Sequence, residues 1–327
     1  MNKKLICMLV VIGVFSSLWI TNGVLGGEKG FPTKRVEIVS PWGAGGSTSI
    51  GGRIIAGTLS EFLEVPVVVI NKTGGGGSVG AGYVAKSKPD GYTLLIYTAA
   101  ANVIMPNLRS VPYSRANFEE LALYGSQELP FVVKNDAPWK TLQELVADAK
   151  KNPGKLKFAT PGIGTSSHFS MEIFKSAVGG LELKHVPFKS GPECVAAILG
   201  GHVDFATLYL IDVKGAVEAG RLRMLAIPTE ERLKDYPDIP TCAELGYPEA
   251  KLSSWYGIAA PSGVPKEISD KLKNALYKTI KHREVMKLLS KVGLNPVFKD
   301  SEEFTKFVSD TEKKIMRISK EAGIKLD

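Results

Sequence analysis

The chain has 327 residues, of which 44% are hydrophobic and 23% charged, and its formal net charge is +8. This is ordinary globular composition, with enough length for two domains that each bury a core. Basic residues alternate with acidic ones and form no patch interleaved with aromatic side chains, so we expect no nucleic-acid partner.

The N-terminus has the pattern of a secretory signal peptide. Lys3 and Lys4 precede an apolar run over residues 5–20, and a Gly-rich polar segment follows, with small residues at Val24 and Gly26. We predict residues 1–26 as a cleaved signal peptide that directs the protein to the periplasm. The alternative is a retained membrane anchor, which the polar exit disfavours. Cys7 has no lipoprotein cleavage box before it, so we expect no lipid anchor.

Short apolar segments alternate with amphipathic ones along the rest of the chain. The segments that predict strands span residues 35–41, 65–72, 92–98, 122–135, 156–162, 183–189, 203–210, 222–229 and 255–262. The segments that predict helices span residues 48–62, 79–88, 141–152, 166–178, 192–199, 212–219, 266–281, 284–292 and 301–322. This alternation predicts an α/β protein with largely parallel sheets.

We expect the chain to cross between two domains in extended segments. Residues 123–133 leave the first half, and residues 252–259 return before the helical C-terminal part. The predicted domain 1 is therefore residues 27–127 plus 255–327, and domain 2 is residues 128–254. Two crossings place a ligand cleft between the domains, with the crossings as the hinge.

Three glycine-rich loops each follow a predicted strand and open a predicted helix: PWGAGGSTS from residue 41, TGGGGSVG from residue 73 and PGIGTSSH from residue 161. Glycines let backbone N–H groups converge, and a helix N-terminus attracts anions. The first loop lacks the lysine of a phosphate-binding P-loop. The second matches G-x-G-x-x-G without the acidic residue of a dinucleotide site, so we assign it a turn role. We assign ligand binding to the first and third loops.

Catalytic and metal-binding signatures are absent, and the four histidines lack metal-ligand spacing. His168 follows Ser166 closely, which could indicate a nucleophile and its base. The simpler interpretation is that His168 orients the loop or donates to an anion. Asp204 is interpreted as a ligand contact, an interdomain cap or a turn residue. We expect no catalytic residue, metal or cofactor.

Two cysteines lie beyond the predicted signal peptide, Cys194 in a helical pattern and Cys242 in a loop. In an exported protein they could form a disulfide. The alternative is that both are small buried thiols.

Several stretches in order resemble one known family. They are FPTKRVEIVSPWGAGGSTSIGGRI, VPVVVINKTGGGGSVGAGYVAKSKPDGYTLL, FATPGIGTSSH, HVPFKSGPECVAAILGGHVDF, RLRMLAIPTEERLKDYPDIPTCAELGYP and WYGIAAPSGVP. Each is similar to the corresponding block of the substrate-binding proteins of tripartite tricarboxylate transporters, the Bug or TctC-like family. The resemblance runs from about residue 31 to the C-terminus.

The resemblance implies a type II periplasmic-binding-protein fold, in which two α/β domains close on a small ligand, usually a carboxylate. It implies a grip made largely by backbone amides and ordered water. By position, it implies ligand contacts from Trp42, Gly43, Ala44, Gly45, Gly46, Ser47, Thr48, Thr98, Gly162, Gly164, Thr165, Ser166, His168 and Asp204.

Two positions depart from the family pattern. Ser49 stands where the family usually has an aspartate, which removes a negative charge from the first loop region, and Phe188 replaces a common tyrosine. The ligand preferences of relatives therefore do not transfer directly to this chain.

The leading hypothesis is an exported solute-binding protein, without enzymatic activity and monomeric, that delivers a small carboxylate to the permease subunits of a tripartite tricarboxylate-type transporter. One alternative is a periplasmic ligand sensor for a signalling receptor. The other is an exported hydrolase that uses Ser166 and His168.

Overall fold

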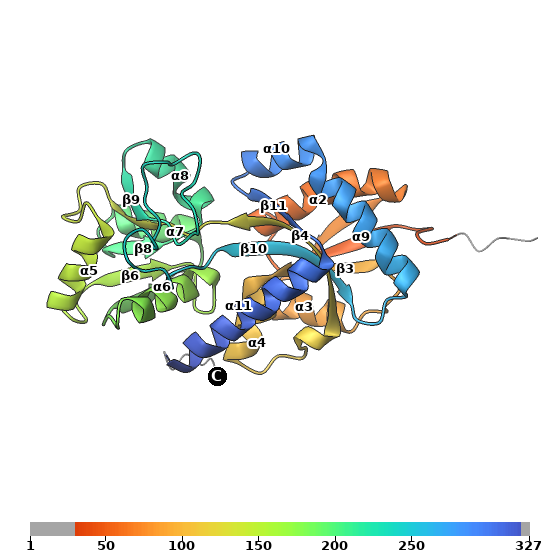
Figure 1. Ribbon diagram of the computed structural model, residues 1–327, viewed down its shortest axis with the longest axis horizontal. Coiled ribbons are helices and arrows are strands. Elements are labelled where there is room, and N and C mark those ends of the chain that lie inside the picture. Colours follow the sequence, from red (N-terminus) through yellow and green to blue (C-terminus); the bar gives the residue numbers. More distant parts are fainter. Residues whose placement is uncertain (1–29, 322–327) are drawn as a thin grey trace, which may run out of the picture.

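The computed structural model describes residues 30–321 as two lobes side by side, each built on a β-sheet covered by helices (Figure 1). The predicted signal peptide lies outside these residues. Within them, no helix combines the length and the apolar character that a membrane span requires. Strands β4 and β10 run from the first lobe toward the second, so the chain passes between the lobes along extended segments (Figure 1).

The first lobe holds a six-stranded sheet in the order β11-β4-β10-β3-β1-β2. Its strands are β1 (Val36–Ser40), β2 (Val67–Asn71), β3 (Thr93–Thr98), β4 (Phe118–Gln127), β10 (Ser254–Pro261) and β11 (Asn295–Lys299). Strand β1 pairs in parallel with β2 and β3. Strand β10 is antiparallel to both β3 and β4, and β11 is antiparallel to β4.

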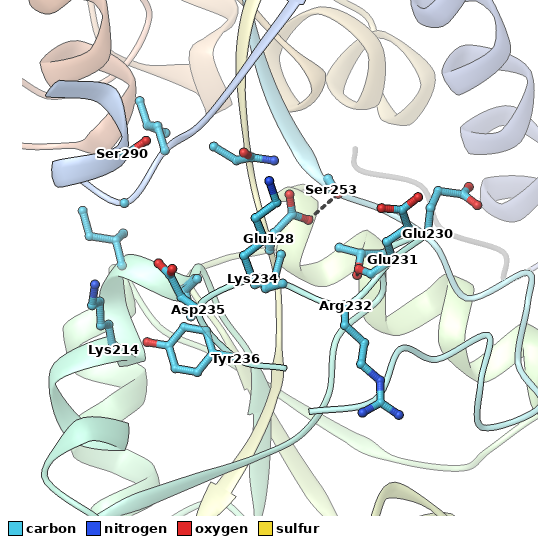
Figure 2. A pocket seen from close by; sticks show the side chains of 17 residues that line it. Glu128, Lys214, Glu230, Glu231, Arg232, Lys234, Asp235, Tyr236, Ser253 and Ser290 are labelled. Atoms are coloured by element: carbon cyan, nitrogen blue, oxygen red, sulfur yellow. Dashed lines mark hydrogen bonds between the residues drawn. The ribbon is translucent and has the colours of Figure 1, made fainter. Parts of the chain in front are cut away.

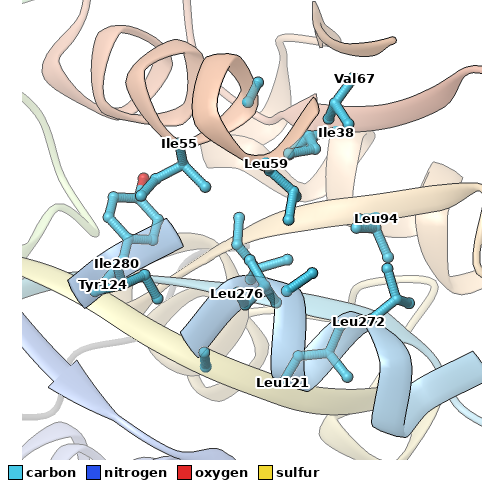
Figure 3. Packing of buried hydrophobic residues seen from close by; sticks show 14 of the residues in the cluster. Ile38, Ile55, Leu59, Val67, Leu94, Leu121, Tyr124, Leu272, Leu276 and Ile280 are labelled. Atoms are coloured by element: carbon cyan, nitrogen blue, oxygen red, sulfur yellow. The ribbon is translucent and has the colours of Figure 1, made fainter. Parts of the chain in front are cut away.

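Helices cover both faces of this sheet because the side chains of a strand alternate between the faces. Ile38 belongs to the core shared with α2 (Ser47–Leu63), α9 (Lys266–Lys281) and α10 (Arg283–Lys291), drawn in Figure 3. Val39, the next residue, belongs to the opposite core. That core includes side chains of α3 (Ser78–Ala85), α4 (Met105–Leu108) and α11 (Ser301–Glu321).

The second lobe holds a five-stranded sheet in the order β7-β6-β8-β5-β9. Its strands are β5 (Phe131–Lys134), β6 (Lys157–Thr160), β7 (Lys184–Pro187), β8 (Phe205–Thr207) and β9 (Leu222–Ala226). Helices α5 (Leu142–Lys151) and α6 (Ser166–Ala177) share one core with it, and α7 (Gly191–Leu199) and α8 (Leu210–Glu218) share the other. Helix α11 reaches across from the first lobe, where Ser176 of α6 donates a hydrogen bond to Glu321 (3.2 Å).

The two sheets repeat one arrangement. In each, the strand next to one edge (β1 or β6) has a parallel neighbour on either side, and antiparallel pairings complete the sheet. Parallel strands present their carboxyl ends at a common edge, where α/β proteins bind ligands. The first and third glycine loops follow β1 and β6, so they occupy equivalent places in the two lobes.

Each predicted strand segment contains a strand, and the α/β class with two sheets is confirmed. The expectation of largely parallel sheets is wrong, because both sheets are mixed. The segment predicted as one strand over residues 122–135 is divided between β4 and β5, which belong to different sheets. The first sheet takes its strands from residues 36–127 and 254–299, and the second from residues 131–226. The predicted domain limits remain our proposal.

Several short elements were not predicted from the sequence. These are the 3-10 helices η1 (Gly75–Gly77) and η3 (Arg115–Asn117), the π-helical turn η2 (Ala100–Ile104), α4 and the edge strand β11. The two cysteines are free and buried, and they belong to cores on opposite faces of the second sheet. The structure therefore shows two buried thiols rather than a disulfide.

Gly80 allows α3 to approach the ends of β1 and β2. A Cβ atom at this position would lie 2.7 Å from the carbonyl oxygen of Lys72 and 2.8 Å from Cα of Pro41. Since both neighbours are backbone atoms, we predict that Gly80→Ala lowers the free energy of unfolding by about 2–3 kcal/mol.

Gly57 in α2 provides the matched control, because it is exposed and a Cβ there would meet nothing within 4 Å. Gly57→Ala should raise the free energy of unfolding by about 0.5–1 kcal/mol. Urea denaturation of both variants measures the two changes. Equal effects of the two substitutions would contradict the close approach at Gly80.

Candidate functional site

The first glycine loop, residues 41–46, joins β1 to α2 through a turn held by Ser40. The Ser40 hydroxyl donates to the carbonyl of Trp42 (3.2 Å) and accepts from the Trp42 N–H (3.4 Å). Gly46 caps α2 in an extended conformation, and no side chain caps the helix. The N–H groups of the first turn of α2 therefore remain available to an anionic group.

Three side chains support this loop from behind. The Asn71 amide donates to the carbonyl of Trp42 (2.7 Å) and to the hydroxyl of Ser49 (2.8 Å). Arg53 donates to the carbonyl of Ala44 (2.9 Å) and to the amide oxygen of Asn71 (3.1 Å). Ser49 stands where the family usually has an aspartate. It is fully buried, and through its hydrogen bond with Asn71 it helps to hold the loop.

The third glycine loop, residues 161–165, repeats the turn of the first. The Thr160 hydroxyl donates to the carbonyl of Gly162 (3.2 Å) and accepts from the Gly162 N–H (3.4 Å). Gly162 and Gly164 have φ angles of 129° and 79°, which residues with a Cβ adopt rarely. The Thr165 hydroxyl caps α6 by accepting from the His168 N–H (3.2 Å).

Two stacked histidines support the third glycine loop. The rings of His168 and His185 lie 4.5 Å apart, and His185 also stacks on Phe158. Nδ1 of His168 accepts from the Gly164 N–H (3.4 Å), and Nε2 of His185 lies 2.7 Å from the Thr160 hydroxyl. Burial lowers the pKa of each histidine to about 4, so both rings are neutral near pH 7.

The arrangement around His168 favours the loop-orienting interpretation over the hydrolase. The buried hydroxyl of Ser166 makes no hydrogen bond within the described structure, so it does not contact the imidazole as a nucleophile contacts its base. The imidazole instead receives the hydrogen bond from Gly164 and stacks on His185.

A row of hydroxyl groups along β10 connects the two loops. On the first-lobe side, Ser47 at the start of α2 lies 3.4 Å from the Tyr256 hydroxyl, and both donate to the side-chain oxygen of Gln127, at 3.1 and 2.8 Å. On the second-lobe side lies Tyr209. Burial raises the pKa of its phenol, and the nearby hydroxyls of Ser254 and Ser166 partly offset this rise. Ser166 opens α6, so the row runs from one helix N-terminus to the other.

Several buried polar atoms along this edge lack a hydrogen-bond partner within the described residues. They include Nε2 of Gln127, Oγ of Ser166 and Nδ2 of Asn102. A buried donor without a partner is costly, and a bound ligand can satisfy it. Thr98 is buried at the same edge. Its N–H donates to Asn102 (3.0 Å) and its hydroxyl accepts from the Ala101 N–H (3.3 Å), both within the turn after β3.

The structure does not bring Asp204 to either loop. Its carboxylate accepts from the Lys157 N–H (2.7 Å), at the start of β6. The loop at residues 161–165 follows the other end of that strand. Asp204 therefore joins the amino ends of β6 and β8 rather than bonding its own turn, and we leave it out of the proposed site.

A cavity of about 550 Å³ lies between the lobes and includes neither glycine loop among its lining residues (Figure 2). It is bordered by residues 229–236 and 293–295 and by the crossing segments. At the crossings, the buried carboxylate of Glu128 accepts hydrogen bonds from Ser253 (2.5 Å) and Ser126 (3.0 Å), as Figure 2 shows for Ser253. Burial raises the pKa of Glu128. Glu128 thus ties the two crossing segments to each other.

Metal-ion ligation is not supported by residues 30–321, where no three His, Cys, Asp or Glu side chains cluster as a metal site would require. Glycine loops, hydroxyls and helix N-termini remain as the groups of the candidate site.

Comparison with known proteins identifies the family. Residues 52–324 match the model of the TctC family, described as the tripartite tricarboxylate transporter family receptor. The chain belongs to this family. It is therefore a periplasmic solute-binding protein of the TctC type, a transporter receptor rather than an enzyme, as the sequence analysis predicted.

Relatives cover nearly the whole of this receptor. Protein BugT of Bordetella pertussis is 31% identical over 327 residues, covering 98% of each chain. An R. palustris protein determined with adipate superposes with a TM-score of 0.80 at 29% identity, covering 90% of this receptor and 99% of that chain. A TctC solute-binding protein from Polaromonas has a TM-score of 0.77 at 25% identity, covering 89% and 99%.

Several residues of the receptor's candidate site were not predicted from the sequence. They are Asn71, Gln127, Tyr209 and Tyr256. None belongs to a sequence motif, and they reach the loops only through strand pairing and the crossings between the lobes. The available signal for Asn71, Tyr209 and Tyr256 was their position near the ends of predicted strands, whereas Gln127 lay inside the single strand predicted over residues 122–135.

The histidine pair predicts how the stability of the receptor depends on pH. An unfolded histidine binds a proton below about pH 6.5, whereas His168 and His185 in the folded protein bind one only near pH 4. The unfolded state holds more protons between these values, so the contribution of the pair is complete above about pH 6.5 and is lost toward pH 4. We predict a loss of roughly 2–4 kcal/mol.

Urea denaturation between about pH 7.5 and pH 4.5 measures this loss as a difference between the wild type and the His168→Asn/His185→Asn double variant. Burial raises the pKa values of Glu128 and Asp212, so these groups change the stability in the opposite direction. They are present in both proteins, so their effect cancels and the difference isolates the histidines. Exposed His202 provides the control, and His202→Gln should follow the wild type. An unchanged pH dependence in the double variant would show that the pair does not cause it.

Proposed function

We propose that this receptor captures a small carboxylate between the loops at residues 41–48 and 161–168 and delivers it to the membrane subunits of a tripartite tricarboxylate transporter. The observation that carries the proposal is the repeated loop geometry. Each lobe presents a helix N-terminus behind a glycine turn, and the hydroxyl row connects the two. We further propose that residues 1–26 direct export and are removed.

The chemistry of the loops suits a carboxylate. The uncapped N–H groups at the start of α2 attract negative charge, and hydrogen bonds from neutral donors to a carboxylate are strong. The unpartnered donors of Gln127 and Ser166 lie along the same edge. The R. palustris relative determined with adipate supports a small carboxylate as the ligand class.

Hinge closure provides the transport signal in this proposal. A ligand that contacts both loops stabilises the closed arrangement of the lobes, since it gains contacts there that it lacks in the open one. The crossings at Glu128 and Ser253 would act as the hinge, and the permease would recognise the closed form.

A thermal-shift screen tests the ligand class. The purified protein is unfolded and refolded to remove any ligand that it carried, and is then mixed with carboxylates and with the alcohols or amides of the same carbon skeletons. Members of the carboxylate set should raise the melting temperature, and their uncharged counterparts should not. A folded protein that responds to no carboxylate would overturn the proposed function.

Ser166→Ala directly tests the role of the third glycine loop in ligand binding. Because the Ser166 hydroxyl makes no hydrogen bond in the described structure, its removal should leave the melting temperature nearly unchanged. Its loss as a donor to the ligand should weaken carboxylate binding about tenfold, as measured by calorimetry. Ser176→Ala, on the exposed side of the same helix, is the matched control and should bind as the wild type does.

A further inference from the structure

Asp212 occupies a distinctive place beside the candidate site. It lies in the first turn of α8, against the first residue of α7. A Cβ atom at Gly191 would lie only 2.0 Å from Oδ2 of Asp212, so the carboxyl group takes the space that a side chain at residue 191 would need. The starts of α7 and α8 follow β7 and β8, at the same edge of the second sheet as the loop at residues 161–165.

The carboxyl group of Asp212 lies near the hydroxyl row. Burial raises the pKa of the phenols of Tyr209 and Tyr256, the two aromatic members of that row, and the charge of Asp212 adds a smaller contribution to both rises. Tyr256 contacts Ser47 of the first lobe, and Tyr209 lies near Ser166 of the second. Asp212 therefore stands beside the space where the two loops would grip a ligand.

Asp212 has no partner among residues 30–321. Its carboxylate takes part in no ion pair and no hydrogen bond of the described structure, and burial raises its pKa to about 6 without an opposing cation. The ionisable groups near it are the phenols of Tyr209 and Tyr256 and the thiol of Cys194 on α7. None of these supplies a positive charge near pH 7.

We propose that Asp212 makes this receptor select carboxylates that also carry an ammonium group over dicarboxylates. The inference rests on the proposed function, because it assumes that the two loops hold one carboxylate. An ionised Asp212 repels a second carboxylate at the other end of the ligand, and it accepts a charge-assisted hydrogen bond from an ammonium group there. Discrimination then comes from a repulsive element as well as an attractive one.

Matched ligand pairs test the selectivity. Calorimetry near neutral pH compares adipate with aminocaproate, glutarate with aminovalerate, and succinate with aminobutyrate, each pair having the same chain length. The amino acid that binds most tightly should have an affinity about tenfold or more above that of the dicarboxylate in its pair. In Asp212→Asn this preference should fall by about tenfold, because the charge is removed at nearly constant shape.

Two further variants keep the result interpretable. Asp212→Ser removes the carboxyl group with a smaller side chain, and it should lose the same preference. It provides the test if Asp212→Asn folds poorly. Glu218→Gln removes a negative charge from the exposed end of the same helix, where Glu218 faces Lys214 (3.9 Å). It should retain the wild-type preference.

The pH dependence gives an independent readout. As the pH falls from about 8 to about 6, protonation of Asp212 should strengthen dicarboxylate binding in the wild type and leave Asp212→Asn unchanged. His168 and His185, with pKa values of about 4, stay neutral over this range.

The outcomes separate the two proposals. If no carboxylate of either kind binds, the proposed function fails. If dicarboxylates bind as well as their amino partners, and Asp212→Asn changes neither affinity nor its pH dependence, the selectivity inference is overturned while the proposed function stands.

Discussion

The hydrogen bond from Tyr256 to Gln127 connects the two places where the chain passes between the lobes. Gln127 ends β4, and Tyr256 lies in the returning strand β10. The side-chain oxygen of Gln127 accepts from the Tyr256 hydroxyl (2.8 Å) and also from the Ser47 hydroxyl at the start of α2 (3.1 Å). One buried amide oxygen thus fixes both crossings relative to the first glycine loop. The position of that loop with respect to the second lobe depends on this junction.

The two sides of the crossings differ in chemistry. On one side lie neutral hydroxyls and amides, the uncapped N-terminus of α2 and the carboxyl group of Asp212. On the other, a cavity with charged residues of both signs surrounds Glu128, whose buried carboxylate is held by two serines (Figure 2). A small anion is better accommodated by neutral donors and helix dipoles than by a mixed-charge rim.

The strands and the glycine loops were predictable because their signals are local. Apolar runs with the period of a strand, and glycines before a helix start, depend on a few adjacent residues. Asp204 was misjudged because a family position says nothing of the strand end at which it lies. The mixed strand directions escaped prediction, since β10 joins the first sheet only after an excursion of more than 120 residues through the second lobe.

By itself, the sequence determined the α/β class, the family and the two loops that resemble one another, since periodicity, glycine content and motif order are properties of the linear chain. Only the tertiary structure decided what surrounds those loops. Ser47 meets Tyr256 across 209 residues, and the carboxyl of Asp212 fills the space left by Gly191. Such contacts arise from the packing of distant elements, so no local pattern in the chain encodes them.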